Sequence, residues 1–117
     1  MAYIDGFVLP VKATDKQAYL DMARAAAPVF KEHGALRVVE CWPDDVPRGE
    51  RTDFYRAVDA QEGEIAVFSW IEWPSKAARD AGMKRVWDDP RLCPGEDAPP
   101  FDMKRMIVGG FAPILDA

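Results

Sequence analysis

Residues 64–73, with the sequence EIAVFSWIEW, form the strongest β-strand candidate in the chain. The run is almost continuously apolar and rich in aromatic and β-branched side chains, which is typical of a strand that is buried on both faces. We therefore expect this segment to lie near the centre of a sheet.

Two strands and a helix are predicted before this segment. The β-branched and aromatic residues of Tyr3–Leu9 predict the first strand, ended by Pro10, whose nitrogen cannot donate to a ladder. Apolar residues at spacings of three and four predict a helix over Asp15–His33. Leu36–Trp42 predicts the second strand. Phe54–Val58 is too short to decide between a strand extension and one helical turn.

A helix, a loop and a strand are predicted after this segment. Ser75 is suited to cap the start of a helix that runs to about Asp88. Arg91–Pro100 is rich in proline and has no periodicity, which predicts a loop. Strand character returns over Phe101–Ala112, where Gly109-Gly110 indicates a bulge or a close backbone approach. The order of elements is βαββαβ.

This order predicts one α+β domain of the ferredoxin-like class over residues 1–117. Such a domain has a four-stranded antiparallel sheet, with the first and third strands central and both helices on one face. The other face of the sheet is then bare, and the apolar side chains on the third strand would lie in water. A second copy of the chain is the simplest cover, so we expect a homodimer that forms an α/β barrel.

Composition excludes several classes of function. The 20 acidic and 15 basic residues give a net charge of −5, and the basic residues are scattered, which disfavours binding to nucleic acid. No apolar run reaches the roughly 20 residues of a membrane span, and the N-terminus lacks a secretory pattern, so we expect no membrane partner and a cytoplasmic location. The motifs of nucleotide hydrolases, serine esterases and zinc proteases are absent.

The cysteine and histidine content predicts no metal site. Cys41 and Cys93 are far apart, and His33 is the one histidine, so no structural zinc site can be assembled. Both cysteines are expected to be free thiols, Cys41 within a strand and Cys93 in a loop. His33 falls in the last turn of the first helix, where a cation complements the helix dipole. No cofactor is indicated.

Polar residues in the predicted strands are the candidates for chemistry. They are Asp5, Glu40, Ser69, Trp70 and Arg105, all placed mid-strand by the predicted pairing. Asp5 and Arg105 would lie on neighbouring strands and form a natural pair. One interpretation is a structural salt bridge, because a buried lone carboxylate is costly. The other is a polar cavity wall, in which Arg105 holds a carboxylate or enolate while Asp5 or Glu40 exchanges a proton.

The chain also has four tryptophans, which is many for its size. They are Trp42, Trp70, Trp73 and Trp87. Their large apolar surfaces could line a pocket for an aromatic molecule, or they could anchor the core and a dimer interface. The sequence leaves both interpretations open.

Several segments together resemble the uncharacterised YbaA-like proteins of bacteria, which are placed in the dimeric α/β-barrel superfamily. The similarity runs from end to end and is carried by YIDGFVLPV (3–11), EHGAL (32–36), VFSWI (67–71), DPRL (89–92) and PFDMKRMIVGGF (100–111). The resemblance implies a fold and a dimer, but it implies no activity, cofactor or catalytic residue. Other members of the superfamily include cofactor-independent monooxygenases, muconolactone isomerases and small stress-response barrels, and a shared fold does not settle function.

Two hypotheses for function follow. The first is a non-catalytic dimeric module that binds a small-molecule ligand or serves in a stress response. The alternative is a cofactor-independent enzyme, similar to a monooxygenase or an isomerase, that acts on a small aromatic or carbonyl compound. A retained ligand in a wet cavity bordered by Asp5, Glu40 and Arg105 would favour the enzyme, whereas a dry, packed interior would favour the binding module.

Overall fold

The computed structural model describes residues 2–92 and 99–117. Their elements are β1 (Tyr3–Lys12), the short 3-10 helix η1 (Ala13–Asp15), α1 (Lys16–Glu32), β2 (Arg37–Cys41), α2 (Phe54–Ala57), β3 (Glu64–Trp73), α3 (Lys76–Asp88) and β4 (Ile107–Phe111). Apart from the two short helices, this is the predicted βαββαβ order.

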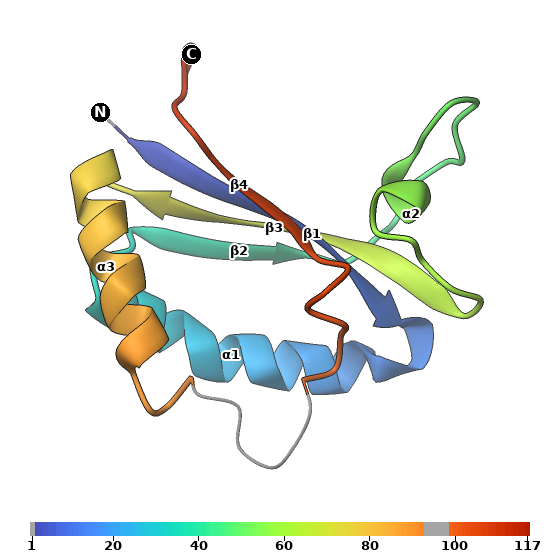
Figure 1. Cartoon of the computed structure of the whole chain (residues 1–117), viewed down its shortest axis with the longest axis horizontal. Helices are drawn as coiled ribbons and strands as arrows, with labels where there is room; N and C mark the ends of the chain where they lie inside the picture. The colour runs from blue at the N-terminus through green and yellow to red at the C-terminus, as the bar shows by residue number, and fades with distance from the viewer. Residues whose placement is uncertain (1, 93–98) are drawn as a thin grey trace.

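The four strands form one antiparallel sheet in the order β2-β3-β1-β4. The central position of β1 and β3 is confirmed, and β3 has the predicted bounds. These two strands pair along ten residues each, from Tyr3 opposite Trp73 to Lys12 opposite Glu64. Helices α1 and α3 lie together on one side of the sheet, whereas α2 lies at the far end on the other side (Figure 1). The chain therefore has an α+β, ferredoxin-like fold.

Two strand boundaries differ from the prediction by more than one residue. β1 continues through Pro10 to Lys12, because β4 pairs with β1 only as far as Val8 and leaves that side of Pro10 without a neighbour. A proline is tolerated at such an edge position. β4 begins at Ile107 and not at Phe101, so Arg105 lies outside the sheet.

The helix caps, the loop after α3 and the glycine pair of β4 can be compared with the prediction. The ambiguous segment after residue 53 forms α2, whose N-cap Asp53 accepts a hydrogen bond from the Arg56 amide at 2.8 Å. Ser75 caps α3 as expected, accepting from the Ala78 amide at 3.0 Å. The predicted loop Arg91–Pro100 lies partly outside the described residues. The β1–β4 register runs without interruption through Gly109 and Gly110, so no bulge is formed; of the two predicted alternatives, the close approach is found at Gly110, whose backbone lies against Arg79 and Tyr3.

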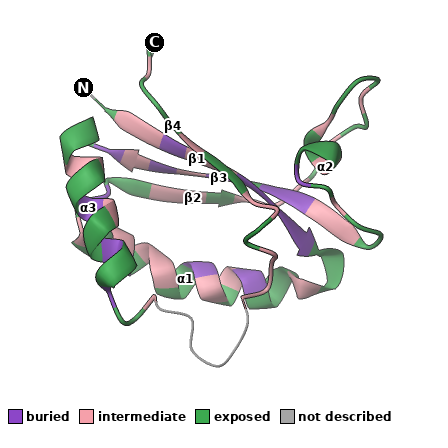
Figure 2. Ribbon diagram, viewed as in Figure 1, coloured by how far each residue is buried: buried purple, intermediate pink, exposed green. Residues whose placement is uncertain are grey.

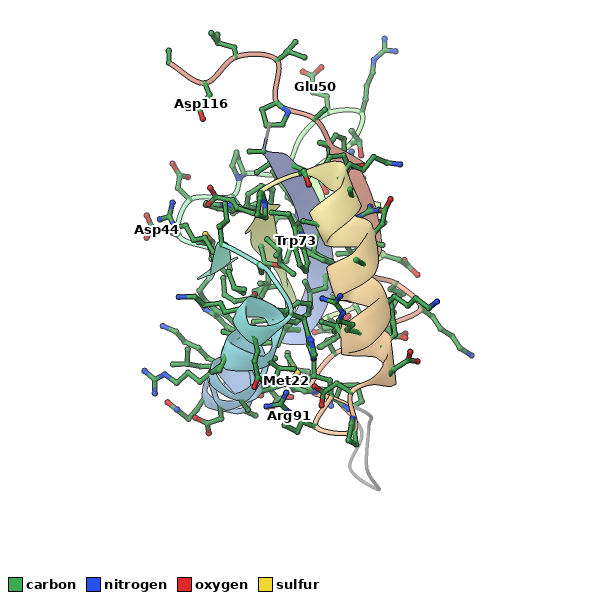
Figure 3. All side chains as sticks on the ribbon, turned by 90° about the vertical axis from the view of Figure 1, so that its left-hand side faces the viewer. Met22, Asp44, Glu50, Trp73, Arg91 and Asp116 are labelled. Atoms are coloured by element: carbon green, nitrogen blue, oxygen red, sulfur yellow. The ribbon has the colours of Figure 1, made fainter. Side chains whose placement is uncertain are left out.

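The two faces of the sheet are different in character. Side chains alternate between faces along each strand, and one face packs against α1 and α3. Its core contains Leu9, Val11, Val67, Ile71 and Trp73, all at most 4% exposed. Figure 3 shows Trp73 between the sheet and α3, where its ring fills the space beside Gly82.

We call the opposite side the open face. Its strand residues include Ile4, Gly6, Val8, Val39, Phe68, Trp70, Ile107, Gly109 and Phe111. At one end, Val58 beside α2 packs on Val8 and Ala66 and covers that part of the face. No described residue covers the rest, and Figure 2 colours most of β4 as exposed. The expectation that β3 is buried on both faces is therefore wrong for an isolated chain, because Phe68 is 45% exposed.

Candidate functional site

The five predicted site residues do not form one site. Asp5, Glu40 and Ser69 are on the face that packs against the helices, Trp70 is on the open face, and Arg105 precedes β4. The sheet register places Ser69 directly between Phe7 and Glu40, whereas Asp5 belongs to the next row of residues. The predicted cavity bordered by Asp5, Glu40 and Arg105 is therefore not formed.

Asp5 is a structural anchor between the sheet and α3. Its side chain is 2% exposed and accepts a hydrogen bond from the Trp73 indole nitrogen at 2.9 Å. Arg79 of α3 lies over it, with the guanidinium Nη2 3.0 Å from Oδ1 and Nε 3.2 Å from Oδ2. The predicted pair of Asp5 with Arg105 is wrong, because the cation comes from the helix above the strand and not from the neighbouring strand.

Arg105 forms a second, separate clamp. Its guanidinium donates to both carboxylate oxygens of Glu64 at 2.6 and 2.9 Å, and to Asp102 at 2.9 Å. A fourth hydrogen bond goes to the backbone oxygen of Asp59 at 2.8 Å. The hydrogen bonds from Arg105 hold the pKa of Glu64 below its usual value. These bonds fasten the segment before β4 to the start of β3, which is a structural role.

Glu40 is part of a cluster of hydroxyl groups. Tyr19, on the buried side of α1, donates from its hydroxyl to Glu40 Oε2 at 2.5 Å. The Ser69 hydroxyl also hydrogen-bonds within this cluster. Ser69 is 4% exposed, whereas Glu40 is an exposed residue of the edge strand β2. Tyr19 is not among the candidate residues that the sequence indicated, and its contact with Glu40 was not predicted.

The environment of the cluster shifts both titrating groups. Loss of water around the carboxylate raises the pKa of Glu40 above its usual value, and the hydrogen bonds from Tyr19 and Ser69 oppose this only in part. Burial, followed by the negative charge of Glu40, raises the pKa of Tyr19 above the ordinary value of a phenol. A carboxylate with a raised pKa can exchange a proton nearer neutral pH.

Aromatic side chains surround the Tyr19 ring. Its centroid lies 6.5 Å from that of Trp42 and 6.2 Å from that of Phe101. Lys16, at the start of α1, places its ammonium nitrogen 5.8 Å from the centroid of the Trp42 ring. The cluster thus joins a carboxylate to an aromatic wall at the edge of the sheet.

The open face carries a shallow apolar groove of about 260 Å³. Gly6 and Gly109 are opposite each other in register on this face, and the ring of Phe111 lies over both of them. Phe68, Ile107 and Phe111 are among the residues that line the groove. Trp70 belongs to the same face, with its ring centroid 5.8 Å from that of Phe68.

The remaining candidates have structural environments. His33 is the C-cap residue of α1, and its ring nitrogen Nε2 lies 2.8 Å from Asp89 Oδ2, a contact that the sequence did not predict. Cys41 is a free, half-buried thiol on β2, and Cys93 lies outside the described residues. Of the other tryptophans, Trp73 is in the core and Trp87 is 69% exposed on α3. Residues 2–92 and 99–117 contain no group of three metal-ligating side chains and no helix able to cross a membrane.

Known proteins share sequence similarity with this chain over nearly its full length. The model of a family described as proteins of unknown function, DUF1428, matches residues 2–103. The chain belongs to this family. It is 57% identical over 116 residues to the uncharacterised protein YbaA of Escherichia coli K12, covering 99% of both chains, and equally similar to YbaA of Shigella flexneri. The end-to-end resemblance inferred from the sequence is therefore confirmed.

Two solved structures have a similar fold. An uncharacterised NIPSNAP domain protein from Burkholderia xenovorans aligns with a TM-score of 0.58 and 16% identity, over 95% of this chain and 93% of that one. A protein from an uncultured marine organism, described as a dimeric ferredoxin-like protein, aligns with a TM-score of 0.57 and 11% identity over the whole of both chains. At these identities the similarity concerns the fold, and the DUF1428 family itself has no assigned activity.

Proposed function

We propose that this protein is a homodimer that assembles through the open face and binds a small molecule without transforming it. The observation that carries the proposal is the apolar character of the open face. Phe68 and Ile107 are each 45% exposed there, and Phe111 is 63% exposed. Soluble monomers rarely leave a connected apolar surface of this kind in water, so such a surface marks an interface.

The size of the open face suits a dimer. Two strands of ten residues and two of five, each residue covering about 4.8 by 3.3 Å, span roughly 480 Å². A stable interface buries about 800 Å² on each partner, so the face supplies roughly half of that area. A two-fold dimer brings the same patch of both copies together, and a self-complementary apolar surface meets that requirement. The dimeric state of the similar marine protein is consistent with this assembly.

The separation of the charged groups supports binding over catalysis. A proton-transfer site requires an acid, a base and a charge-stabilising group around one reacting atom. Here Asp5 is fastened by Trp73 and Arg79, while Arg105 is occupied by Glu64 and Asp102. Glu40 is thus left without the predicted partners.

The dimer is tested by sedimentation velocity of the Phe111→Lys variant across a range of concentrations. We expect the wild-type chain to sediment as a dimer and the variant as a monomer, because the new charge would be buried unpaired in the interface. Trp87→Lys is the matched control, since Trp87 is 69% exposed on α3, away from the open face. A wild-type chain that remains a monomer at working concentrations would overturn the proposal.

Ligand binding is tested by native mass spectrometry of freshly purified protein. We expect a mass equal to that of the dimer plus one retained small molecule. This molecule is then isolated and incubated with fresh protein. Recovery of the molecule unchanged supports the binding function. No retained molecule in preparations from several growth conditions would contradict it.

A second candidate function is a cofactor-independent proton-transfer enzyme. The raised pKa of Glu40 favours this candidate, because a carboxylate that titrates nearer neutrality is suited to general acid–base catalysis. A change in the mass or structure of the retained molecule on incubation would support the enzyme, provided that Glu40→Gln abolishes the change.

A further inference from the structure

The C-terminal end of the chain carries much of the exposed apolar surface of the described residues. Residues 106–115 contain no charged side chain. Half of the large apolar side chains that are exposed in the described chain belong to residues 107–115, and they are Ile107, Val108, Phe111, Ile114 and Leu115. Ile114 and Leu115 lie in a short tail after β4 and are 100% and 82% exposed. Soluble proteins seldom leave such a run in water, so the run marks a contact surface.

The strands of the open face supply only part of the area that the proposed dimer needs. They span about 480 Å², whereas a stable interface buries about 800 Å² on each partner. Parts of the chain outside the strands must therefore supply roughly 300 Å² on each copy. The tail continues directly from Phe111, which is on the open face, and is thus placed to extend the same interface.

A hollow of about 190 Å³ opens on the same side of the sheet, beyond the end of β2. Phe54 of α2 and Phe68 of β3 line it, and these two side chains are 46% and 45% exposed. Their ring centroids are 6.3 Å apart in an edge-to-face contact, and Cys41 and Trp42 extend the wall. A cavity of about 150 Å³ can hold benzene, so the hollow has room for a large aliphatic side chain.

The hollow and the tail lie at opposite corners of the sheet. One row of the register runs from Cys41 on β2 through Phe68 and Val8, and it ends at Ile107 on β4. Phe111 is further along β4, which places it about 20 Å from Cys41. Figure 1 shows the tail leaving one end of the sheet and α2 at the other end. A two-fold axis in the plane between two facing sheets exchanges such corners when the strands of the sheets cross at near right angles, a known packing of sheets.

We propose that the C-terminal tail of each copy docks in the hollow of its partner. Ile114 and Leu115 then lie against the rings of Phe54 and Phe68 of the partner subunit. A two-fold dimer forms this contact twice, and on each copy it covers both the tail and the hollow. The inference rests on the homodimer proposed above and names the segment that completes its interface.

A disulfide trap tests which copy the tail contacts. Ile114→Cys is made in a Cys93→Ser background, so that Cys41 is the other thiol. The three residues after Phe111 span at most about 10 Å, which leaves position 114 roughly 10 Å from Cys41 of the same copy, beyond the reach of a disulfide. We expect mild oxidation to give a covalent dimer joined through Cys41, identified by non-reducing electrophoresis and peptide mass spectrometry. Adding Cys41→Ser, or replacing Ile114→Cys by Trp87→Cys, should abolish this product.

Two neighbouring substitutions measure what the tail contributes to the dimer. Leu115→Asn should weaken the dimer at least about tenfold, because each dimer loses two buried leucine side chains. Asp116→Asn introduces the same side chain at the next position. This control should leave the dimer at least as tight, because Asp44 and Asp45 also line the hollow and repel a negative charge. Sedimentation velocity over a range of concentrations measures both variants.

The outcomes separate this inference from the proposed dimer. A wild-type chain that is a monomer overturns both. If the wild type is a dimer, the absence of a link from Ile114→Cys to Cys41, or equal dimer affinity of Leu115→Asn and wild type, overturns only the docking of the tail. A link to Cys41 in a protein whose Phe111→Lys variant remains a dimer supports the tail contact and overturns assembly through the open face.

Discussion

At the scale of single residues, buried polar groups in this protein are secured by partners from distant parts of the chain. Asp5 of β1 is held by Trp73 at the end of β3 and by Arg79 of α3. The sheet and the helix are thereby joined through one carboxylate. Removing the carboxylate of such a group leaves the charge of its partner without a counter-charge.

Asp5→Asn should therefore destabilise the fold strongly. The Arg79 side chain, 25% exposed, would keep its charge and lose the buried carboxylate, at a cost of about 3 kcal/mol in the free energy of unfolding. Urea denaturation provides the measurement. Asp80→Asn, which removes the exposed carboxylate on the other side of the same Arg79, should have little effect. Equal losses in the two variants would contradict the anchoring role of Asp5.

Removal of the Glu40 carboxylate is expected to raise the stability of the fold at neutral pH, whereas removal of the Asp5 carboxylate lowers it. Because its pKa is raised in the folded state, its ionisation destabilises the fold. The stability that Glu40 contributes is fully present below the unfolded carboxyl pKa and is lost as the pH rises through the folded pKa. Glu40→Gln should thus be more stable than wild type at neutral pH, and this gain should disappear below the unfolded pKa.

Thermal unfolding from pH 3 to pH 8 measures this difference. The control is Glu62→Gln, which removes a carboxylate from the turn before β3 and leaves Tyr19 and Ser69 in place. A Glu40→Gln variant that is less stable than wild type at pH 7 would show that the carboxylate is a net stabilising group.

At the scale of elements, β4 depends on close contacts that require glycine. A Cβ atom on Gly110 would collide with the Arg79 guanidinium and the Tyr3 hydroxyl, both part of the packing between sheet and α3. A Cβ atom on Gly109, which is on the open face, would lie 3.1 Å from the exposed ring of Phe111, which has room to turn. An added side chain is thus better tolerated at Gly109 than at Gly110.

We expect Gly110→Ala to cost about 2 kcal/mol, the usual penalty of overpacking, and Gly109→Ala to cost much less. Chemical denaturation of both variants at one protein concentration tests the difference. If Gly109→Ala were the more damaging variant, the assignment of the two faces of β4 would be wrong.

The segment before β4 is held by Arg105. Arg105→Ala should lower stability by about 1–3 kcal/mol, because the variant loses a two-bond contact with Glu64 and the bond to Asp102. Differential scanning calorimetry measures the loss. Near-normal melting together with lost ligand binding would instead identify Arg105 as a site residue.

At the scale of the whole molecule, the two faces of the sheet differ in how far they are buried. The face beneath α1 and α3 is filled by the core, whereas most residues of the open face are half-buried or exposed in the single chain. The C-terminal tail after β4 adds Ile114 and Leu115 to the exposed apolar residues, and Figure 1 shows this tail leaving the sheet. Exposure on this scale is the physical reason for the proposed dimer.

Local patterns were sufficient for most of the fold. The bounds of β3, the start of α3 at its Ser75 cap, the element order and the central position of β1 and β3 were all predictable. In each case the pattern reports a short-range preference, such as apolar periodicity or a capping hydroxyl. The start of β4 was not predictable, because Phe101–Met106 has strand-like composition but packs as a loop.

The candidate site was only partly predictable. Glu40 and Ser69 were correctly placed within the second and third strands, but their pairing with each other and the contact with Tyr19 were not predicted. Likewise, the cation beside Asp5 was sought on the next strand and lies on a helix. Hydrogen bonds between elements depend on how the helices are placed over the sheet, which residue spacing does not encode.

The sequence by itself determined the type and order of the elements, the family of the chain and the presence of an apolar sheet surface. Only the tertiary structure decided which charges meet, since Asp5 pairs with Arg79, and Glu40 is left with hydroxyl partners. The physical reason is the separation along the chain over which each effect acts. Backbone preferences and side-chain periodicity act over a few residues, whereas the partner of a buried charge is fixed by packing between segments up to 74 residues apart.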